Sequence, residues 1–324
     1  MHSIGTPCLA IVLPVYKAAF LRTALQSICE QDNQYFNVYI GDDASPDDLQ
    51  AIVGEFEDKL NLTYHRFQDN LGRRSLVGQW QRCIALTGRE DWIWLFSDDD
   101  VMEPGCVSGF YKELATDSVR PDAYRFDTVK IDEAGIPMQS NHFPQQMDTR
   151  TFLEIKMGYS EESYMQEYIF RKQRYLELGG FPDFPLGWAS DDAFWLSFLD
   201  RAPIRTIPGP RVHWRYSQAN ISGDACSKET ALLKIQACIQ FLYWLKRNTI
   251  AGQQEWGRRL AVNWYSEQLD WLGQHLSCIR MTGLFALCLP CYPREGFPGL
   301  IRFFWRNFLF RYTRWRNRRK GRMI

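Results

Sequence analysis

The hydrophobic positions in the first 110 residues alternate between two spacings. Short continuous apolar runs, often containing β-branched residues, predict strands that are buried on both faces. Apolar residues at intervals of three and four predict amphipathic helices between them. Strands are expected at 9–13, 38–40, 62–67 and 92–96, and helices at 17–30, 47–59 and 76–86. This alternation with short links predicts right-handed βαβ units, and therefore an α/β fold with a mostly parallel sheet.

Beyond residue 100 the pattern is mixed at first and then helical. The elements expected there are a helix at 105–115 and a strand at 123–131, followed by an irregular stretch rich in Pro, Gln and His, and then helices at 167–178, 228–247 and 253–276. The first of these last three should end at Gly179 and Gly180. A proline-broken linker then leads to a final helix that is both basic and aromatic. We therefore expect an α/β domain over 1–222 and a helical extension over 223–324.

Composition excludes several classes of protein. A hydrophobic fraction of 45% and a charged fraction of 23% are those of a globular protein, not of a disordered or collagen-like chain. The 38 basic residues balance the 38 acidic ones. That balance conceals a separation, because residues 294–324 carry ten basic residues and one acid, a charge of +9, which leaves −9 on the rest.

Neither the start of the chain nor its cysteines indicate secretion. Residues 1–16 lack the basic, apolar and small-residue pattern of a signal peptide. The nine cysteines are widely spaced and odd in number, which favours free thiols. No apolar run reaches the roughly 20 residues that a membrane-spanning helix needs. We therefore expect a cytoplasmic protein without disulfides.

Polar residues follow three of the expected strands directly. Residues 14–16 follow the first strand, Asp42 and Asp43 the second, and residues 98–100 the strand at 92–96. The carboxyl ends of parallel strands converge, so these segments should share one cleft. Three adjacent carboxylates repel one another unless a cation neutralises them, and carboxylate oxygens suit Mg²⁺ or Mn²⁺. A solvated acidic turn is the structural alternative.

Together these segments give the chain a resemblance to the inverting glycosyltransferases of family 2, which have the GT-A fold. The matching pieces are Pro14-Val15-Tyr16, Gly41-Asp42-Asp43-Ala44-Ser45 with Asp47, Asn70-Leu71-Gly72, and Ser97-Asp98-Asp99-Asp100. They occur in family order over about the first 110 residues, and the likeness continues more weakly to about residue 220. The resemblance implies a Rossmann-like sheet and transfer of a sugar from a nucleotide-diphosphate donor.

The resemblance also assigns donor contacts. Pro14, Val15 and Tyr16 would line the nucleotide pocket. Either Asp42 or Asp43 would accept a hydrogen bond from the base, although capping of the next helix would explain both acids equally well.

Further donor contacts come from arginines and from the acidic triplet. Arg73, or its neighbour Arg74, would reach the nucleotide or its phosphates, and plain exposure to solvent is the alternative for either one. Asp98 would approach the ribose and take part in metal binding, Asp100 would bind the metal held by the diphosphate, and Asp99 would assist either role. The implied cofactor is a divalent metal ion, Mn²⁺ or Mg²⁺.

Inversion in one step also requires a general base for the acceptor hydroxyl. The segment Trp188–Trp195 resembles the family's Glu-Asp motif, but this chain has Ser190-Asp191-Asp192 there. Aligning on Trp195 makes Asp191 the base, which we favour, and aligning on the acidic pair makes it Asp192. The structural alternative is that the two acids stabilise the start of a helix through its dipole.

Residues 212–216 are expected to close the site. His213 is a candidate third metal ligand, with a structural histidine as the alternative, and Arg215 is a candidate phosphate clamp. Trp188 and Trp214 are candidates for stacking on a sugar ring, although most of the twelve tryptophans must fill core.

In the C-terminal segment 294–324, aromatic and aliphatic residues alternate with arginines. Such a helix is too polar to span a bilayer but fits the headgroup plane of an anionic membrane. Nucleic-acid binding through stacked aromatics and a structural helix with a charged end are the alternatives. We favour the membrane and expect no nucleic-acid partner.

The resemblance implies transfer of a sugar, expected to come from a UDP-sugar, to a hydroxyl of a glycan or lipid-linked glycan in cell-surface polysaccharide synthesis. The protein would lie on the inner face of the cell membrane. A sugar-nucleotide pyrophosphorylase is one alternative, but residues 14–19 contain no glycine-rich phosphate loop. A non-catalytic membrane or nucleic-acid binding protein with the same fold is the other.

Overall fold

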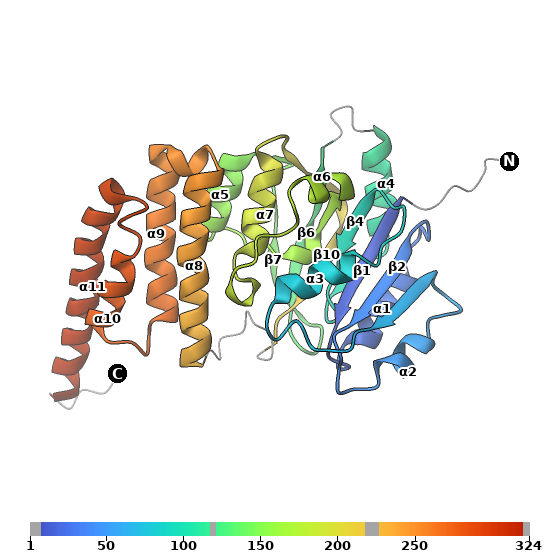
Figure 1. The fold of residues 1–324 in the computed structure, drawn as a ribbon, viewed down its shortest axis with the longest axis horizontal. Coiled ribbons are helices and arrows are strands. Elements are labelled where there is room, and N and C mark those ends of the chain that lie inside the picture. Colours follow the sequence, from blue (N-terminus) through green and yellow to red (C-terminus); the bar gives the residue numbers. More distant parts are fainter. Residues whose placement is uncertain (1–7, 117–120, 218–226, 320–324) are drawn as a thin grey trace. The chain divides into compact units, whose positions relative to one another are not determined.

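The computed structural model describes residues 8–116, 121–217 and 227–319, with side chains as far as residue 309. The chain divides into two compact units, which we call the α/β unit (1–225) and the helical unit (226–324) (Figure 1). The boundary expected at 222–223 lies outside the described residues. Eight of the nine cysteines are described and all eight are free thiols, as expected.

The α/β unit is built on one sheet of mixed direction. Its strands are β1 (Leu9–Val15), β2 (Asn37–Asp42), β3 (Leu62–Arg66), β4 (Trp92–Leu95), β5 (Val101–Met102), β6 (Ala123–Ile131), β7 (Pro137–Asn141), β8 (Gln146–Met147), β9 (Tyr168–Arg171) and β10 (Ile204–Arg215). They follow the order β3-β2-β1-β4-β9-β6-β10-β5, with β7 on β6 and β8 on β10. The first four are parallel, and β9 runs antiparallel to both of its neighbours.

Helices cover both faces of this sheet. They are α1 (Leu21–Cys29), α2 (Leu49–Gly54), α3 (Leu76–Ile84), α4 (Cys106–Thr116), α5 (Thr149–Gly158), α6 (Lys172–Glu177) and α7 (Ser190–Leu199). Leu9, Ile11 and Leu13 belong to a core that also contains residues of α1, α2 and α4. Ala10 and Val12 point to the opposite face and are equally inaccessible to solvent. Burial on both faces explains the continuous apolar run, and the expected α/β fold is confirmed.

An aromatic cluster attaches α7 to the sheet. Phe170 on β9 lies edge-on to Phe194, and Phe181 lies against Phe194 with 3.8 Å between ring centroids. Trp195 stacks on Tyr168 at 4.0 Å. These contacts hold the first turn of α7, which carries Asp191 and Asp192, at a defined place beside β9.

Two sequence expectations are wrong in this unit. The helix expected at 167–178 is the strand β9 followed by the shorter α6, because residues 168–171 pair between β4 and β6. Its end is confirmed, since Gly179 and Gly180 have φ of 73° and 90°. The stretch expected to be irregular after residue 131 contains β7, β8 and α5.

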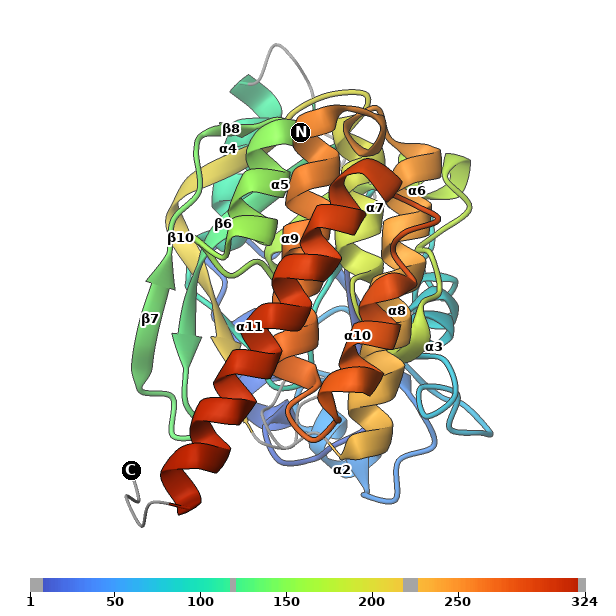
Figure 2. The same ribbon diagram turned by 90° about the vertical axis from the view of Figure 1, so that its left-hand side faces the viewer.

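The helical unit contains α8 (Lys228–Asn248), α9 (Glu255–Leu272), α10 (Cys278–Ala286) and α11 (Pro293–Arg319) (Figure 2). Helix α9 packs against α8 and α11, and α10 packs against α9 and α11. The linker expected before the last helix contains α10, and Pro298 lies inside α11 rather than before it. Among the described helices, none has the length and hydropathy needed to cross a bilayer.

Candidate active site

The loop after β1 and the acids after β4 are joined by hydrogen bonds. Asp98 Oδ2 accepts the backbone N–H groups of Tyr16 at 3.0 Å and of Lys17 at 3.2 Å. The hydroxyl of Ser45, after β2, donates to the carbonyl of Tyr16 at 2.6 Å. Pro14 lies opposite Gly41 and Val15 opposite Asp42 in the parallel register. The polar segments at the carboxyl ends of β1, β2 and β4 are therefore brought together, as expected.

Asp42 is buried and holds the end of β2 to β3. Its carboxylate accepts hydrogen bonds from the Tyr64 hydroxyl at 2.6 Å and from Arg66 Nη1 at 2.9 Å. The backbone N–H of Ser45 donates to it at 2.8 Å. Burial, together with the charge of Asp42, raises the pKa of Tyr64 to about 12. Asp42 thus has three protein donors in this structure.

Asp43 holds the Asn70-Leu71-Gly72 turn. Its two oxygens accept the backbone N–H groups of Leu71 at 2.8 Å and Gly72 at 2.9 Å. Arg82 of α3 forms an ion pair with the same carboxylate. A Cβ at Gly72 would lie 2.6 Å from Asp43 Oδ2, so the turn requires glycine for this close approach. Sequence reasoning did not identify Arg82.

The arginines beyond this turn lie at the surface. Arg73 is exposed, and Arg74 forms an ion pair with Asp69 at 2.5 Å. Arg82 also pairs with Asp69, at 3.1 Å. Asp69 therefore gathers two arginines beside the turn, and the exposed Arg73 follows that turn directly.

Asp100 is the most deeply buried of the three acids after β4. Its Oδ1 accepts the backbone N–H of Arg215 at 2.7 Å, and among the described residues its Oδ2 is buried without a hydrogen-bond partner. Burial and the neighbouring charge of Asp99 raise the pKa of Asp100 well above its ordinary value. Burying an unpaired carboxylate oxygen is costly, and a bound cation would remove that cost. The donor set, carboxylate oxygens alone, fits Mg²⁺ or Mn²⁺.

Arg215 holds two loops in place. Its guanidinium donates to the carbonyl oxygens of Asp99 at 2.8 Å, Asp132 at 3.0 Å and Glu133 at 3.1 Å. It also lies 4.4 Å above the ring of Phe20. The residue expected to clamp a phosphate is therefore nearly buried and binds the backbone around the acidic triplet.

His213 lies on β10 opposite Val101 of β5. Its Nε2 is 2.9 Å from Glu103 Oε1, and Glu103 also pairs with Arg211 at 2.8 Å. Within the described ranges, no group of three or more His, Cys, Asp or Glu side chains is placed to hold a metal ion. The aspartates after β4 can thus supply only part of a coordination shell.

The second pair of acids lies in the first turn of α7. This helix begins at Ser190, directly after Ala189, whose φ is 62°. Asp192 is buried and forms an ion pair with Lys156 of α5 at 3.0 Å. Asp191 is partly exposed. Burial and the charge of Asp192 raise the pKa of Asp191 to about 7, against the opposing effect of Lys156. A carboxylate with that pKa exchanges protons near neutral pH.

Residues 163 and 164 connect the two acidic groups. Lys156 Nζ donates to the carbonyl oxygen of Ser163 at 2.8 Å. The ring of Tyr164 stacks on Trp214 at 4.2 Å. Burial, the nearby Glu162 and Glu167, and the charge of Asp100 raise the pKa of Tyr164 above its ordinary value. The acids after β4 and the acids of α7 therefore lie near the same short segment. Sequence reasoning did not identify Lys156 or Tyr164.

Comparisons with known proteins bear on the family and the fold of this chain. The model of the family "Glycosyl transferase family 2" matches residues 10–178. The hyaluronan synthase of Pasteurella multocida is 31% identical over 127 residues, which are 38% of this chain and 13% of that protein. The chondroitin synthase of Escherichia coli is 40% identical over 63 residues, 19% of this chain and 9% of that protein. The chain thus spans a small part of these two relatives.

Solved structures show the same fold at low sequence identity. S. aureus TarS 1–349 in complex with UDP-GlcNAc has a TM-score of 0.58 and 14% identity, covering 94% of this chain and 92% of that one. The mannosyltransferase PcManGT from Pyrobaculum calidifontis, in complex with GDP-Man and Mn²⁺, has a TM-score of 0.56 and 15% identity, covering 94% and 88%. Because the family model covers more than half of the sequence and the fold agrees with it, this chain belongs to glycosyl transferase family 2.

Proposed function

We propose that this chain transfers a sugar from a nucleotide-diphosphate donor to a hydroxyl group, with residues 1–222 as the transferase domain. The observation that carries the proposal is the buried oxygen of Asp100 that has no hydrogen-bond partner among the described residues. It lies beside Asp98, which is hydrogen-bonded to the loop after β1. That arrangement suits a cation and a diphosphate. Family membership favours transfer over the pyrophosphorylase alternative.

The donor is proposed to be a UDP-sugar. The nucleotide would contact Pro14, Val15 and Tyr16, of which Tyr16 is 40% exposed, and Asp98 would face the ribose. The complex of TarS with UDP-GlcNAc is consistent with a uridine nucleotide, whereas PcManGT, which has the same fold, was solved with GDP-Man.

The remaining donor contacts are proposed around this pocket. Asp42 or Asp43 would receive the base, each already held in place by neighbouring donors. Arg73 would reach the phosphates from the exposed turn. Asp99 would assist the ribose or the metal, and Arg215 would fix the loop that presents the acids.

Asp100 and Asp98 are proposed to hold Mn²⁺ or Mg²⁺ with oxygens of the donor diphosphate, and His213 would join them only by leaving Glu103. The bound ion would stabilise the charge that develops on the departing nucleoside diphosphate. The mannosyltransferase solved with GDP-Man and Mn²⁺ supports this cofactor for the fold.

Asp191 is proposed to take the proton from the acceptor hydroxyl. Its pKa of about 7 and its partial exposure suit a base that must meet substrate. Asp192 is the alternative, but it is buried and paired with Lys156, so a hydroxyl group would have to displace an ion pair to reach it. One displacement at the anomeric carbon, with the base opposite the leaving group, inverts that centre.

Two variants test the assignment. Asp191→Asn should lose transfer almost completely while UDP binding, measured by calorimetry, is retained, because the side chain keeps its size and loses only its basicity. Asp192→Asn should keep measurable transfer. The reverse outcome would make Asp192 the base.

An assay of donor hydrolysis tests whether the chain is an enzyme. Absence of Mn²⁺-dependent release of nucleoside diphosphate from every common donor would falsify the transferase proposal in favour of a non-catalytic protein. Loss of that release in Asp100→Asn would locate the metal.

The acceptor is proposed to be a glycan or lipid-linked glycan of the cell surface, reached by a peripheral position on the inner face of the membrane. The charge of +9 over 294–324 supports this placement. Removing residues 297–324 should release the protein from anionic vesicles while donor hydrolysis continues. Equal vesicle binding by the shortened chain would refute the role of the tail.

A further inference from the structure

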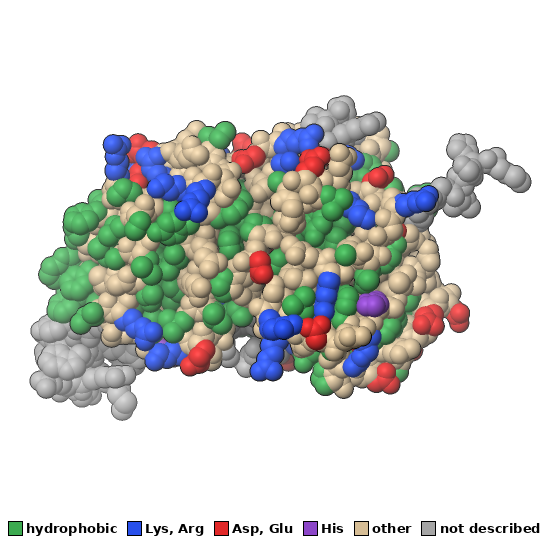
Figure 3. Space-filling model, in the orientation of Figure 1, with side chains coloured by type: hydrophobic (Ala, Val, Ile, Leu, Met, Phe, Trp, Pro, Cys, Tyr) green, Lys and Arg blue, Asp and Glu red, His purple; other side chains and the backbone are tan. Residues whose placement is uncertain are grey.

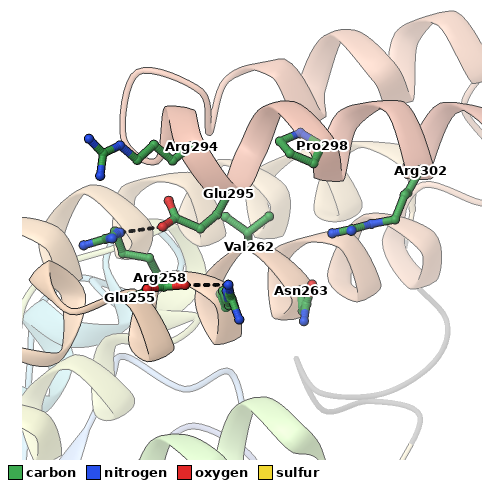
Figure 4. A pocket seen from close by; sticks show the side chains of 9 residues that line it. Glu255, Arg258, Val262, Asn263, Arg294, Glu295, Pro298 and Arg302 are labelled. Atoms are coloured by element: carbon green, nitrogen blue, oxygen red, sulfur yellow. Dashed lines mark hydrogen bonds and ion pairs between the residues drawn. The ribbon is translucent and has the colours of Figure 1, made fainter.

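The helical unit contains a groove between α9 and the start of α11 (Figure 4). Its volume is about 490 Å³, and four arginines and two glutamates contribute to its lining. The charged residues are Glu255, Arg258 and Arg259 from α9, and Arg294, Glu295 and Arg302 from α11. The groove therefore has a net charge of +2 and lies in the other unit from the acids that we assign to catalysis.

Two of these arginines have no acidic partner within the part of the chain that the structure describes. Glu295 pairs with Arg258 at 2.8 Å, and Glu255 pairs with Arg259 at 2.5 Å. Neither Arg294 nor Arg302 forms an ion pair with any residue that the structure describes, and both are exposed. Arg294 also lies in the first turn of α11, where unpaired backbone N–H groups and the helix dipole add positive potential. The free positive charge is thus concentrated at the α11 side of the groove.

An exposed apolar stripe adjoins the groove on the same helix. Phe297, Ile301 and Trp305 repeat every four residues and are 60%, 48% and 53% exposed, and Phe308 and Leu309 continue them. Helix α10 adds Ile279, which is 82% exposed, and Figure 3 shows hydrophobic side chains gathered on the surface of this unit. Exposed aromatic residues bordered by arginines are typical of helices that lie in a membrane interface.

We propose that Arg294 and Arg302, eight residues apart on α11, bind phosphates of anionic lipid headgroups along this groove while the Phe297–Leu309 stripe lies at the acyl boundary. A guanidinium matches phosphate oxygens in pairs and keeps its charge at every relevant pH. A soluble phosphate would satisfy the arginines but leave the adjoining stripe in water, which is why a lipid is the fitting source. The inference rests on the membrane association proposed above and adds a specific site to it.

The test compares vesicle binding of full-length variants by co-sedimentation. The probe is vesicles of phosphatidylcholine with phosphatidylglycerol. Arg294→Gln with Arg302→Gln should weaken binding about 30-fold, since each surface cation contributes to the affinity. Arg89→Gln with Arg150→Gln removes the same charge from exposed positions of the α/β unit and should change binding little. We call the Arg294→Gln, Arg302→Gln double variant the groove variant. Vesicle binding by this variant that equals that of the wild type, or an equal loss of binding in the control, overturns the proposal.

Further measurements separate the possible sources of phosphate and the contribution of the stripe. Trp305→Ser should also weaken vesicle binding, and an unchanged value would remove the stripe from the proposal. Titration with inorganic phosphate should give far weaker binding than vesicles do. Tight phosphate binding that the groove variant loses, with vesicle binding unchanged, would identify a soluble ligand instead.

Donor hydrolysis should remain intact in the groove variant, so that assay judges the transferase separately. If the full chain does not bind anionic vesicles at all, the proposed headgroup site and the proposed membrane association are both wrong, while the transferase proposal stands.

Discussion

Asp191 carries the clearest consequence of a single residue's surroundings. Its pKa is about 7, raised by burial and by Asp192, so protonation removes the proposed base below neutral pH. The value of kcat/KM for transfer should fall about tenfold for each pH unit below that pKa and become constant above it. The measurement is a pH profile between about pH 5.5 and pH 8.5. A flat profile over this range would exclude a base with this pKa.

Lys156 is a positioning residue in the same cluster. Its ammonium lies 3.0 Å from Asp192 and donates to the Ser163 carbonyl. Burial alone would lower the pKa of Lys156, but the charges of Asp192, Asp191 and the nearby Glu167 raise it, so the residue stays charged. It is the cation that offsets the mutual repulsion of the two aspartates.

Replacing this cation should change the pH profile rather than merely the amount of active protein. In Lys156→Met the midpoint of the profile should move upward by about one unit, because the carboxylates lose an opposite charge within contact distance. Lys156→Arg keeps the charge and should restore the midpoint. If both variants lose activity equally at every pH, Lys156 has only a structural role.

At the scale of elements, the site depends on loops held by acids. Asp43 fixes the turn that contains Gly72, and Arg82 fixes Asp43 from α3. In Gly72→Ala the added methyl group would lie 2.6 Å from the Asp43 carboxylate, so the turn must move away. We expect UDP affinity to fall about tenfold, because a buried acceptor loses its donors.

A glycine elsewhere in the α/β unit supplies the control for this variant. Gly54 ends α2, and a Cβ there would meet no atom within 4 Å. Gly54→Ala should leave UDP affinity unchanged and raise the free energy of unfolding by up to about 1 kcal/mol. Calorimetric titration with UDP compares the two variants, and equal affinities would mean that the turn does not support the nucleotide.

The elements that sequence reasoning predicted best are those whose burial is uniform. The strand at 123–131 was predicted with its observed bounds, since most of its residues are buried. No strand was predicted over β10, because Pro208, Gly209 and Pro210 interrupt it. The register on β6 shifts between Ile207 and Arg211, and Gly209 has φ of 104°. Turn residues inside a bulged strand look like a strand end in the sequence.

The candidate site divides in the same way. Asp42, Asp98 and Asp100 could be found because each lies at or just after the end of an apolar strand, and strand ends converge by topology alone. Lys156 and Arg82 lie on helices, and their distance from the acids depends on how those helices pack. Residue spacing in the sequence does not reveal these distances. The cations that pair with buried acids are therefore the part of the site that only the structure identifies.

The charge of the whole molecule is divided between an acidic body and a basic C-terminal segment. Residues 294–324 carry +9 and the remainder −9, so salt should affect the two proposed functions differently. The Debye length falls from about 10 Å at 0.1 M salt to about 3 Å at 1 M, which screens exposed arginines from lipid phosphates. Vesicle binding should therefore drop more than tenfold over that range.

Donor hydrolysis should change much less, because Asp100 is buried and screened little by mobile ions. Co-sedimentation and nucleoside diphosphate release, measured on the same samples, make the comparison. Vesicle binding that survives 1 M salt would mean that apolar insertion of the α11 stripe, not charge, holds the protein at the membrane.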